Sequence, residues 1–217
     1  MKYMLVVGFW IGLLSCNQHP NSRNMMTTDL SAVIPGVDGR KVDTATLANG
    51  CFWCTEAVFQ QLDGVLKVSS GYMGGHVPNP TYKEVCECTT GHAECIQIVY
   101  DPEKISFDDL LEVFWQTHDP TTLNRQGNDV GTQYRSEVFY HNEEQKQKAI
   151  HYKNELEKAK AFDNPIVTAI SPAATFYIAE NYHQDYYNLN GSQPYCYYVI
   201  RPKLEKFKKA FKDKMKH

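Results

Sequence analysis

Two cysteines in a Cys-x-x-Cys spacing are the residues of this 217-residue sequence best suited to chemistry. They lie in the run Gly50-Cys51-Phe52-Trp53-Cys54, where a short strand-forming stretch gives way to a helical pattern. A thiol at the N-terminus of a helix faces unpaired N–H groups, which lower its pKa from about 8.5 towards 7 and so increase the reactive thiolate fraction. Phe52 and Trp53 would then supply apolar walls. The run predicts a nucleophile, Cys51, beside a pocket for a substrate with a small apolar end.

The elements that must position Cys51 alternate between strands and helices without a regular βαβ repeat. Alternating or β-branched residues predict strands at 44–48, 65–71, 96–100, 137–140 and 166–170. Helical periodicity predicts helices at 51–62, 106–118, 142 or 143 to 162, and 202–215. Ser106 and Asp109 have the spacing of a capping box at the start of the second helix. We therefore expect an α+β two-layer sandwich with a ferredoxin-like core, a mixed sheet and packed helices.

Composition and charge are those of a globular protein. Hydrophobic residues make up 42% and the net charge is −3, so disorder and wholesale nucleic-acid binding are both disfavoured. The last segment, from Arg201 to His217, carries eight Lys or Arg against two acidic residues, a net +6 that leaves −9 for residues 1–200. We interpret this basic stretch as the solvated face of a packed C-terminal helix, with attraction to anionic lipid headgroups as a secondary effect. A single domain is expected over 43–217.

The N-terminus has the pattern of an export signal. Residues 4–14 are apolar apart from two glycines, too few to span a bilayer, and the stretch ends at Ser15-Cys16. Residues 13–16 resemble a bacterial lipoprotein cleavage box, which predicts a signal peptide over 1–15 and lipidation of Cys16. Residues 16–42 would be the lipidated N-terminus and tether. We expect an exported cell-envelope protein held on the membrane by its lipid anchor alone; an ordinary signal peptide with a coincidental cysteine is the alternative.

Five further stretches, in order along the chain, resemble the peptide methionine sulfoxide reductase A family from about residue 47 to the Lys-rich end. They are Gly50-Cys51-Phe52-Trp53, Asn79-Pro80-Thr81-Tyr82, Gly91-His92-Ala93-Glu94, His118-Asp119-Pro120-Thr121, and the run from Gly127 to Ser136. The resemblance implies reduction of the S epimer of methionine sulfoxide, free or in oxidised proteins. It implies no metal or organic cofactor, an external thioredoxin-like reductant, and a monomer that visits its substrates transiently.

The same resemblance assigns roles to individual residues. Glu94 is the candidate acid, because the oxygen leaving a sulfoxide needs a proton and burial can keep a Glu protonated at neutral pH. Tyr82 and Tyr134 would donate hydrogen bonds to that oxygen. Asp129 would orient the group or bind the polar backbone of the substrate, with Phe52 and Trp53 around its methyl end. Without the resemblance, each of these residues could equally be a solvated, core or turn residue.

Attack by Cys51 would leave a sulfenic acid on its sulfur, which a second thiol must resolve. Cys54 is the near choice and Cys196 the far one. Relatives often have Gly where this chain has Cys54, and use a C-terminal cysteine instead. We favour Cys196, because Gly, Ser and Pro around it suggest a segment that can swing, while Cys54 would be fixed on a helix.

Other readings of the cysteines remain open from sequence. Cys86, Cys88 and Cys95 could join the Cys-x-x-Cys pair as a zinc site, although Cys-x-Cys is not the usual ligand spacing. Cys95 fits better as a small core residue, and Cys86 with Cys88 as free thiols or an accessory disulfide. A thiol-disulfide oxidoreductase is the alternative enzyme, and a partner-binding lipoprotein the alternative without catalysis. His183 is interpreted as structural.

Overall fold

The structure is a computed structural model that describes residues 41–216. The predicted signal peptide, the lipidation site Cys16 and the tether up to residue 40 lie outside the described residues. Within residues 41–216, no helix combines the length and the apolar character needed to cross a bilayer.

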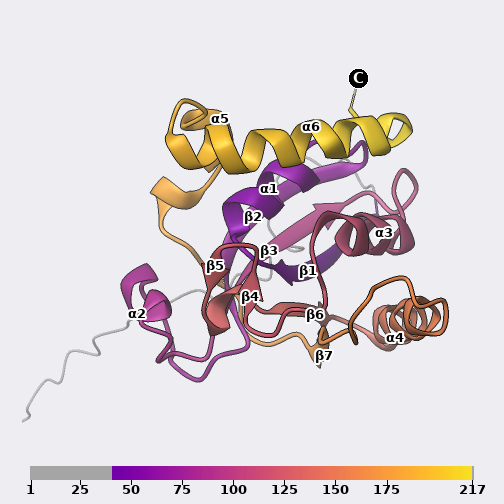
Figure 1. Cartoon of the computed structure of the whole chain (residues 1–217), viewed down its shortest axis with the longest axis horizontal. Helices are drawn as coiled ribbons and strands as arrows, with labels where there is room; N and C mark the ends of the chain where they lie inside the picture. The colour runs from indigo at the N-terminus through magenta and orange to yellow at the C-terminus, as the bar shows by residue number, and fades with distance from the viewer. Residues whose placement is uncertain (1–40, 217) are drawn as a thin grey trace, which may run out of the picture.

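A ferredoxin-like unit forms the centre of the fold. Its elements, in chain order, are β1 (Asp43–Asn49), α1 (Phe52–Phe59), β2 (Val65–Met73), β3 (Ala93–Tyr100), α3 (Phe107–Thr117) and β6 (Ser136–Tyr140). The strands lie in the order β6-β1-β3-β2 and neighbours are antiparallel. The parallel strand β7 (Ala169–Pro172) extends one edge and β8 (Tyr177–Ile178) the other, which makes a mixed six-stranded sheet (Figure 1). The α+β two-layer prediction is confirmed.

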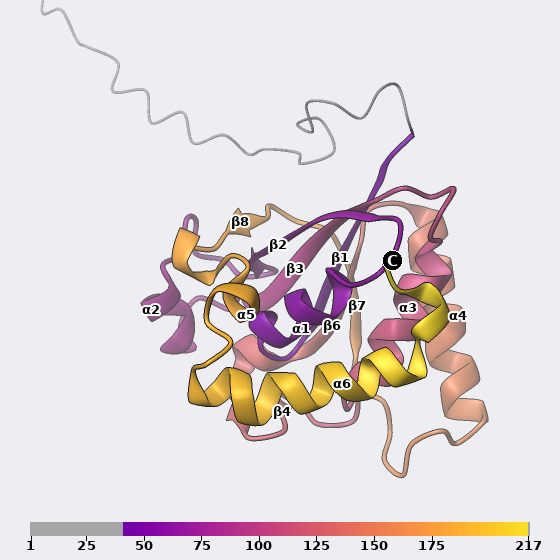
Figure 2. The same cartoon turned by 90° about the horizontal axis from the view of Figure 1, so that it is seen from above.

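The remaining elements surround this unit at its two ends. They are α2 (Tyr82–Cys86), the hairpin β4 (Arg125–Gln126) and β5 (Asp129–Val130), α4 (Glu143–Lys158), α5 (Tyr186–Leu189), a π-helical turn (Cys196–Ile200) and α6 (Arg201–Ala210). Figures 1 and 2 both place α2 and α5 at one end and α3 with α4 at the opposite end, and Figure 2 shows β8 on the side of α2 and α5. Figure 2 shows α1 between the sheet and the long C-terminal helix, so α1 is covered on both sides.

Strand periodicity explains how one polar side chain reaches α1. In β3 all eight residues are buried, and alternate residues point to opposite faces of the sheet. Ile96 and Ile98 pack in the main core with Phe52 of α1, whereas Ala93 and Cys95 belong to a smaller cluster. Glu94 shares the parity of Ile96 and therefore points to the α1 face.

Several predicted boundaries are wrong by a few residues, each for a local reason. The first helix ends at Phe59 instead of 62, and α4 ends at Lys158, two residues before Lys160 with its left-handed φ of 48°. The strand predicted at 166–170 pairs with β6 only from Ala169, because the Val167 N–H donates to the Pro120 carbonyl at 2.9 Å instead.

The helix predicted at 106–118 is confirmed in detail, whereas the helix predicted at 202–215 ends at Ala210. At the start of α3, the Asp109 N–H donates to Ser106 Oγ at 3.1 Å and the Ser106 N–H donates to Asp109 Oδ2 at 2.9 Å, which completes the capping box. The C-terminal helix buries Leu204 and Phe207 and exposes most of its lysines, as expected of a packed helix with a solvated basic face.

Candidate active site

Cys51 lies where β1 turns into α1. Gly50 has a φ of 98°, a conformation that favours glycine, and a Cβ there would stand 2.6 Å from Gln126 Cγ. Cys51 is the N-cap of α1, and its carbonyl accepts hydrogen bonds from the N–H groups of Cys54 at 3.1 Å and Thr55 at 3.2 Å. The predicted placement of the thiol at a helix N-terminus is observed. Only 8% of the residue is exposed.

Glu94 faces this helix terminus from β3. Its Oε2 accepts a hydrogen bond from the Phe52 N–H at 3.0 Å, and the residue is 1% exposed. Burial raises the pKa of Glu94 to about 8, and the nearby Asp129 carboxylate acts in the same direction. Below that pH the carboxyl holds a proton next to the first turn of α1. This is the condition required of an acid that works at neutral pH.

The thiols of Cys51 and Cys54 form a hydrogen-bonded pair, which with Glu94 we call the sulfur site. The hydrogen bond from Cys51 lowers the pKa of Cys54 to about 7, and the positive charge of Lys203 adds to the effect. Burial and the neighbouring Cys54 raise the pKa of Cys51 well above its ordinary value. The pair therefore loses its first proton near neutral pH and its second only at much higher pH.

This distribution of charge corrects one sequence expectation. The helix N-terminus alone would lower the pKa of Cys51, but in this structure withdrawal from water outweighs it. The thiolate of the resting pair is stabilised on Cys54, one helical turn further along.

Phe52 and Trp53, the expected aromatic walls, are held by residues distant in sequence, and neither lines the cavity beside Cys51. Phe52 is fully buried, and the Trp53 Nε1–H donates to His183 Nδ1 at 3.0 Å. Tyr186 stacks on the Trp53 ring with centroids 3.7 Å apart and planes inclined by 6°. One face of the Trp53 ring is thus covered in this structure. His183 has the structural role expected of it, in that it orients Trp53.

The two predicted hydroxyl donors converge on Glu94 from separate elements. Tyr82 begins α2 and its backbone N–H donates to Glu180 Oε1 at 2.8 Å, while Tyr134 ends a 3-10 turn after β5. Burial raises the pKa of both phenols, and the charge of Glu94 raises each further. Both hydroxyls therefore stay protonated at neutral pH and can act as hydrogen-bond donors near the carboxyl.

Asp129 lines a cavity that opens on the sulfur pair. It lies in β5, directly after the tight turn of the β4–β5 hairpin, and its Oδ2 accepts a hydrogen bond from the Tyr195 hydroxyl at 2.8 Å. The cavity measures about 530 Å³. Its walls come from the start of α1, the hairpin and the start of α6, and include Cys51, Cys54, Asn128, Asp129, Tyr195 and Lys203.

Cys196 does not lie in the swinging segment predicted from its Gly, Ser and Pro neighbours. It begins the π-helical turn before α6 and is completely buried, because it packs with Cys51, Cys54 and Ile200 against α1. Burial raises its pKa, and the charge of Cys54 raises it further. Cys51, Cys54 and Cys196 thus share one cluster, and the charge of Cys54 raises the pKa of both other thiols.

Sequence reasoning missed the residues that support the pocket from behind. Glu180 Oε2 accepts from the Tyr72 hydroxyl at 2.9 Å, while its other oxygen holds the backbone of Tyr82. Tyr195 was also missed, although it touches the sulfur pair. No local sequence pattern links these residues to their partners, because the contacts join positions 66 to 108 residues apart in the chain.

The other cysteines do not enter this cluster. Cys95 is buried among Ala48, Met73 and Phe139, as predicted for a core residue. Cys86 and Cys88 are exposed, and all six cysteines of the described region are free thiols. Among residues 41–216, no three or more His, Cys, Asp or Glu side chains are grouped to hold a metal ion.

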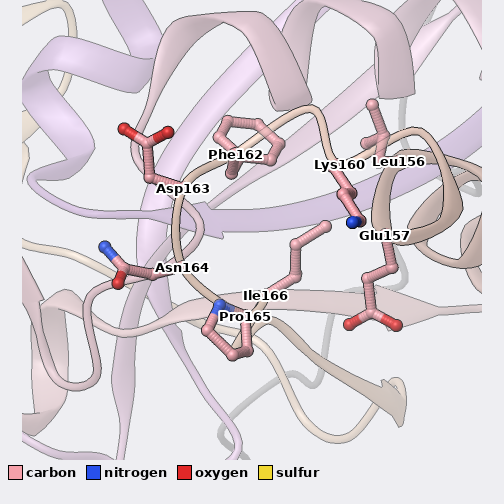
Figure 3. A pocket seen from close by; sticks show the side chains of 8 residues that line it. All are labelled: Leu156, Glu157, Lys160, Phe162, Asp163, Asn164, Pro165 and Ile166. Carbon is pink, nitrogen blue, oxygen red and sulfur yellow. The ribbon is translucent and has the colours of Figure 1, made fainter.

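A second cavity, of about 580 Å³, lies away from the sulfur site at the end of α4 (Figure 3). Phe162 and Ile166 point towards the middle of this view, whereas the carboxylates of Glu157 and Asp163 lie at its edges. Its walls hold neither a cysteine nor a histidine. The sulfur site therefore remains the candidate.

Comparison with known proteins gives consistent matches. Residues 43–215 match the family described as peptide methionine sulfoxide reductase. The peptide methionine sulfoxide reductase MsrA of Saccharolobus solfataricus is 55% identical over 175 residues, which cover 81% of this chain and 98% of that protein. The MsrA of Deinococcus radiodurans is 51% identical over 196 residues, 90% of this chain and 94% of its own length.

Solved structures agree with these matches. The reduced form of Mxr1 from Saccharomyces cerevisiae superposes with a TM-score of 0.67 at 38% identity, covering 72% of this chain and 90% of that one. Methionine sulfoxide reductase A of Corynebacterium diphtheriae superposes with a TM-score of 0.63 at 36% identity, covering 80% and 85%.

Proposed function

Since the chain belongs to the peptide methionine sulfoxide reductase family, we propose that Cys51 and Glu94 carry its reaction as nucleophile and acid. The enzyme is a peptide-methionine (S)-S-oxide reductase, and its substrate is the S epimer of methionine sulfoxide. The further steps follow from the contacts of the sulfur site.

In the first step, the Cys51 sulfur attacks the sulfoxide sulfur while the Glu94 carboxyl gives its proton to the oxygen. The oxygen then passes to Cys51 as a hydroxyl and methionine leaves. Cys51 is oxidised by two electrons to a sulfenic acid, and the sulfoxide is reduced by two to a thioether. Tyr82 and Tyr134 stabilise the developing charge on the oxygen by donating hydrogen bonds.

One observation carries this proposal: a buried, protonated Glu94 is hydrogen-bonded to the first N–H of α1, directly beside Cys51. A thiol pair that ionises near pH 7 and a carboxyl that keeps its proton to about pH 8 are both ready at neutral pH. A simple thiol-disulfide oxidoreductase has no need of the second group.

The test uses the full chain, dithiothreitol and a peptide prepared as each pure sulfoxide epimer. We expect loss of the S sulfoxide only, and loss of that activity in Cys51→Ser. Equal consumption of both epimers, or insulin reduction without sulfoxide reduction, would overturn the proposal.

For the second step we propose that Cys54 resolves the sulfenic acid and that Cys196 then takes over the disulfide. Cys54 is hydrogen-bonded to Cys51, and residues three apart in a helix are close enough for a disulfide. The Cys54 thiol attacks the sulfenic sulfur, which forms the Cys51–Cys54 disulfide and releases water. Cys196, whose pKa responds to the charge of Cys54, then attacks Cys54 and frees the Cys51 thiol.

This order reverses the preference drawn from the sequence, and single variants decide it. After one turnover without reductant, we expect Cys196→Ser to hold the Cys51–Cys54 disulfide and Cys54→Ser to hold a sulfenic acid on Cys51. Alkylation followed by peptide mapping identifies each species. Formation of a Cys51–Cys196 disulfide in Cys54→Ser at the wild-type rate would show that Cys196 resolves directly.

We propose a thioredoxin-like dithiol protein as the reductant of the final disulfide, because each cycle leaves the chain oxidised by two electrons. We also propose export and a lipid tether at Cys16, on the evidence of the sequence alone. Palmitate labelling of cells expressing the chain tests the tether. Label that is lost in Cys16→Ala supports it, and label that persists contradicts it.

A further inference from the structure

The Tyr195 hydroxyl lies against the reacting sulfurs. It donates a hydrogen bond to Asp129 Oδ2 at 2.8 Å and stands 3.7 Å from Cys54 Sγ, and Tyr195 packs against the buried cluster that contains Cys51. Its ring meets Trp53 edge-on, with centroids 5.9 Å apart. Tyr195 therefore contacts Cys54, Asp129 and Trp53 at once, within the cluster that contains Cys51.

A methionine sulfoxide must reach groups that Tyr195 contacts in this structure. The sulfoxide sulfur must come within about 3–3.5 Å of Cys51 Sγ. Cys51 is only 8% exposed, and the Tyr195 hydroxyl is hydrogen-bonded to Asp129 and lies beside Cys54 in the same cavity. The substrate and the Tyr195 hydroxyl thus compete for the same groups.

Tyr195 is joined directly to the third thiol. Cys196 follows it at the start of the π-helical turn and is completely buried, while the outward residues Tyr197 and Tyr198 are 49% and 75% exposed. A π turn replaces regular α-helical hydrogen bonds and is often found at functional sites. The chain before Tyr195 makes a turn at residues 191–192 that contains Gly191, and the helical stretch begins at Pro194. The hydroxyl of Tyr195 is the polar link between this segment and the β4–β5 hairpin.

We propose that Tyr195 is a positioning residue that closes the resting site, and that its displacement by the sulfoxide loosens the segment carrying Cys196. The inference rests on the proposed function. It gives the recycling step its order, because the Cys196 thiol becomes accessible only after substrate has entered. It also explains why a thiol needed late in the cycle is completely buried in the resting chain.

The test measures alkylation of Cys196 in the full-length Cys51→Ser variant, which binds the sulfoxide without reacting. We expect saturating S-sulfoxide peptide to raise the rate of Cys196 modification by about tenfold, resolved from the other cysteines by peptide mapping. Adding Tyr195→Phe to this variant keeps the ring but removes the hydroxyl, so modification should be fast before substrate is added. Tyr198→Phe, on the exposed side of the same turn, is the matched control and should match its parent.

Steady-state kinetics supply a second readout in the otherwise wild-type chain. Tyr195→Phe should lower KM for the S sulfoxide by about fivefold, because the substrate no longer has to break the hydrogen bond of the Tyr195 hydroxyl when it binds. The single-turnover rate at saturation should change by less than about twofold. General damage to the fold would instead lower that rate.

Two results would overturn the inference: Cys196 modification that is unchanged by saturating sulfoxide, or equal protection of Cys196 with and without the Tyr195 hydroxyl. The first would mean that the tyrosine turns aside by side-chain rotation alone. Epimer-selective reduction by the wild-type chain is measured separately, so failure of this inference is distinguishable from failure of the proposed function.

Discussion

Two polar clusters lie close to the same sheet, and only one of them is prepared for chemistry. The sulfur site holds groups that change protonation near neutral pH. The histidine cluster, made of His118, Ser136 and Thr168, lies where α3 ends. There His118 Nδ1–H donates to the Phe114 carbonyl at 2.6 Å, and Nε2 lies 2.7 Å from Ser136 Oγ, which in turn lies 2.8 Å from Thr168 Oγ1.

The two clusters differ in their hydrogen bonding and in whether their groups change protonation near neutral pH. Both ring nitrogens of His118 have partners, and withdrawal of the ring from water lowers its pKa to about 3, so it stays neutral in the working range. In the sulfur site, burial raises the pKa of Glu94 to about 8, and the hydrogen bond with Cys51 lowers the pKa of Cys54 to about 7. Buried groups whose pKa values are moved into the neutral range and that lie beside a nucleophile are candidates for function. A fully bonded neutral cluster marks structure.

The largest expected effect comes from removing the proton of Glu94. Glu94→Gln keeps an oxygen that can accept from the Phe52 N–H but cannot protonate the sulfoxide. We expect single-turnover methionine formation to fall by about 10²–10⁴-fold, the usual contribution of a general acid. A rate within twofold of wild type would mean that Glu94 does not supply the proton, so that the sulfur site would not differ from the histidine cluster in proton donation.

Glu56 provides the matched control for that substitution. It is a second buried carboxyl, on α1 itself, and burial raises its pKa to about 7, yet its Oε2 accepts from the Tyr186 N–H and does not face the sulfur pair. Glu56→Gln should leave the rate within about threefold of wild type. A loss as large as that of Glu94→Gln would show that burial of charge, and not proton transfer, controls the rate.

The pH dependence of the single-turnover rate should sharpen the same contrast. The rate rises through about pH 7 as the thiol pair ionises and falls above about pH 8 as Glu94 loses its proton. Each limb changes about tenfold per pH unit beyond its pKa. Glu94→Gln should lose the alkaline limb and keep the acidic one, and an unchanged alkaline limb in that variant would assign it to another group.

The smallest effect on activity is expected in the histidine cluster. His118→Ala should lower the free energy of unfolding by about 2 kcal/mol, because it removes a buried ring and the hydrogen bonds that the ring makes to the Phe114 carbonyl and the Ser136 hydroxyl. Activity per folded molecule should match wild type. Urea denaturation and the sulfoxide assay measure the two quantities, and a loss of activity without a loss of stability would place His118 in the site.

The same substitution should change acid stability. Because the folded state lowers the pKa of His118 from 6.5 to about 3, the unfolded chain binds the proton first, and stability falls as pH drops below about 6.5. His118→Ala should therefore show a weaker decline in the free energy of unfolding between pH 6.5 and pH 4.

What the sequence could predict depended on whether the deciding contacts were local. The capping residues of α3 lie close together in the sequence and are observed as predicted, whereas the strand that carries Glu94 begins at Ala93, before the predicted start at Ile96. The environment of Cys196 is not local: Gly, Ser and Pro nearby suggested mobility, but packing against α1 holds the residue in a helical turn.

The chemistry of Cys51 shows the same limit. Its position at a helix N-terminus followed from the strand-to-helix transition. Its pKa did not, because the direction is set by burial and by a second thiol whose contact requires the folded chain. Tyr195 could not be identified either, since its partner Asp129 lies 66 residues away in sequence.

The most direct measurement of the central claim is the fate of one oxygen atom. The Cys54→Ser/Cys196→Ser double variant, treated with excess S-sulfoxide peptide and no reductant, should form one methionine per chain and gain one oxygen on Cys51, located by mass spectrometry. Repeated turnover by this variant, or methionine formation with Cys51 left unoxidised, would contradict the account.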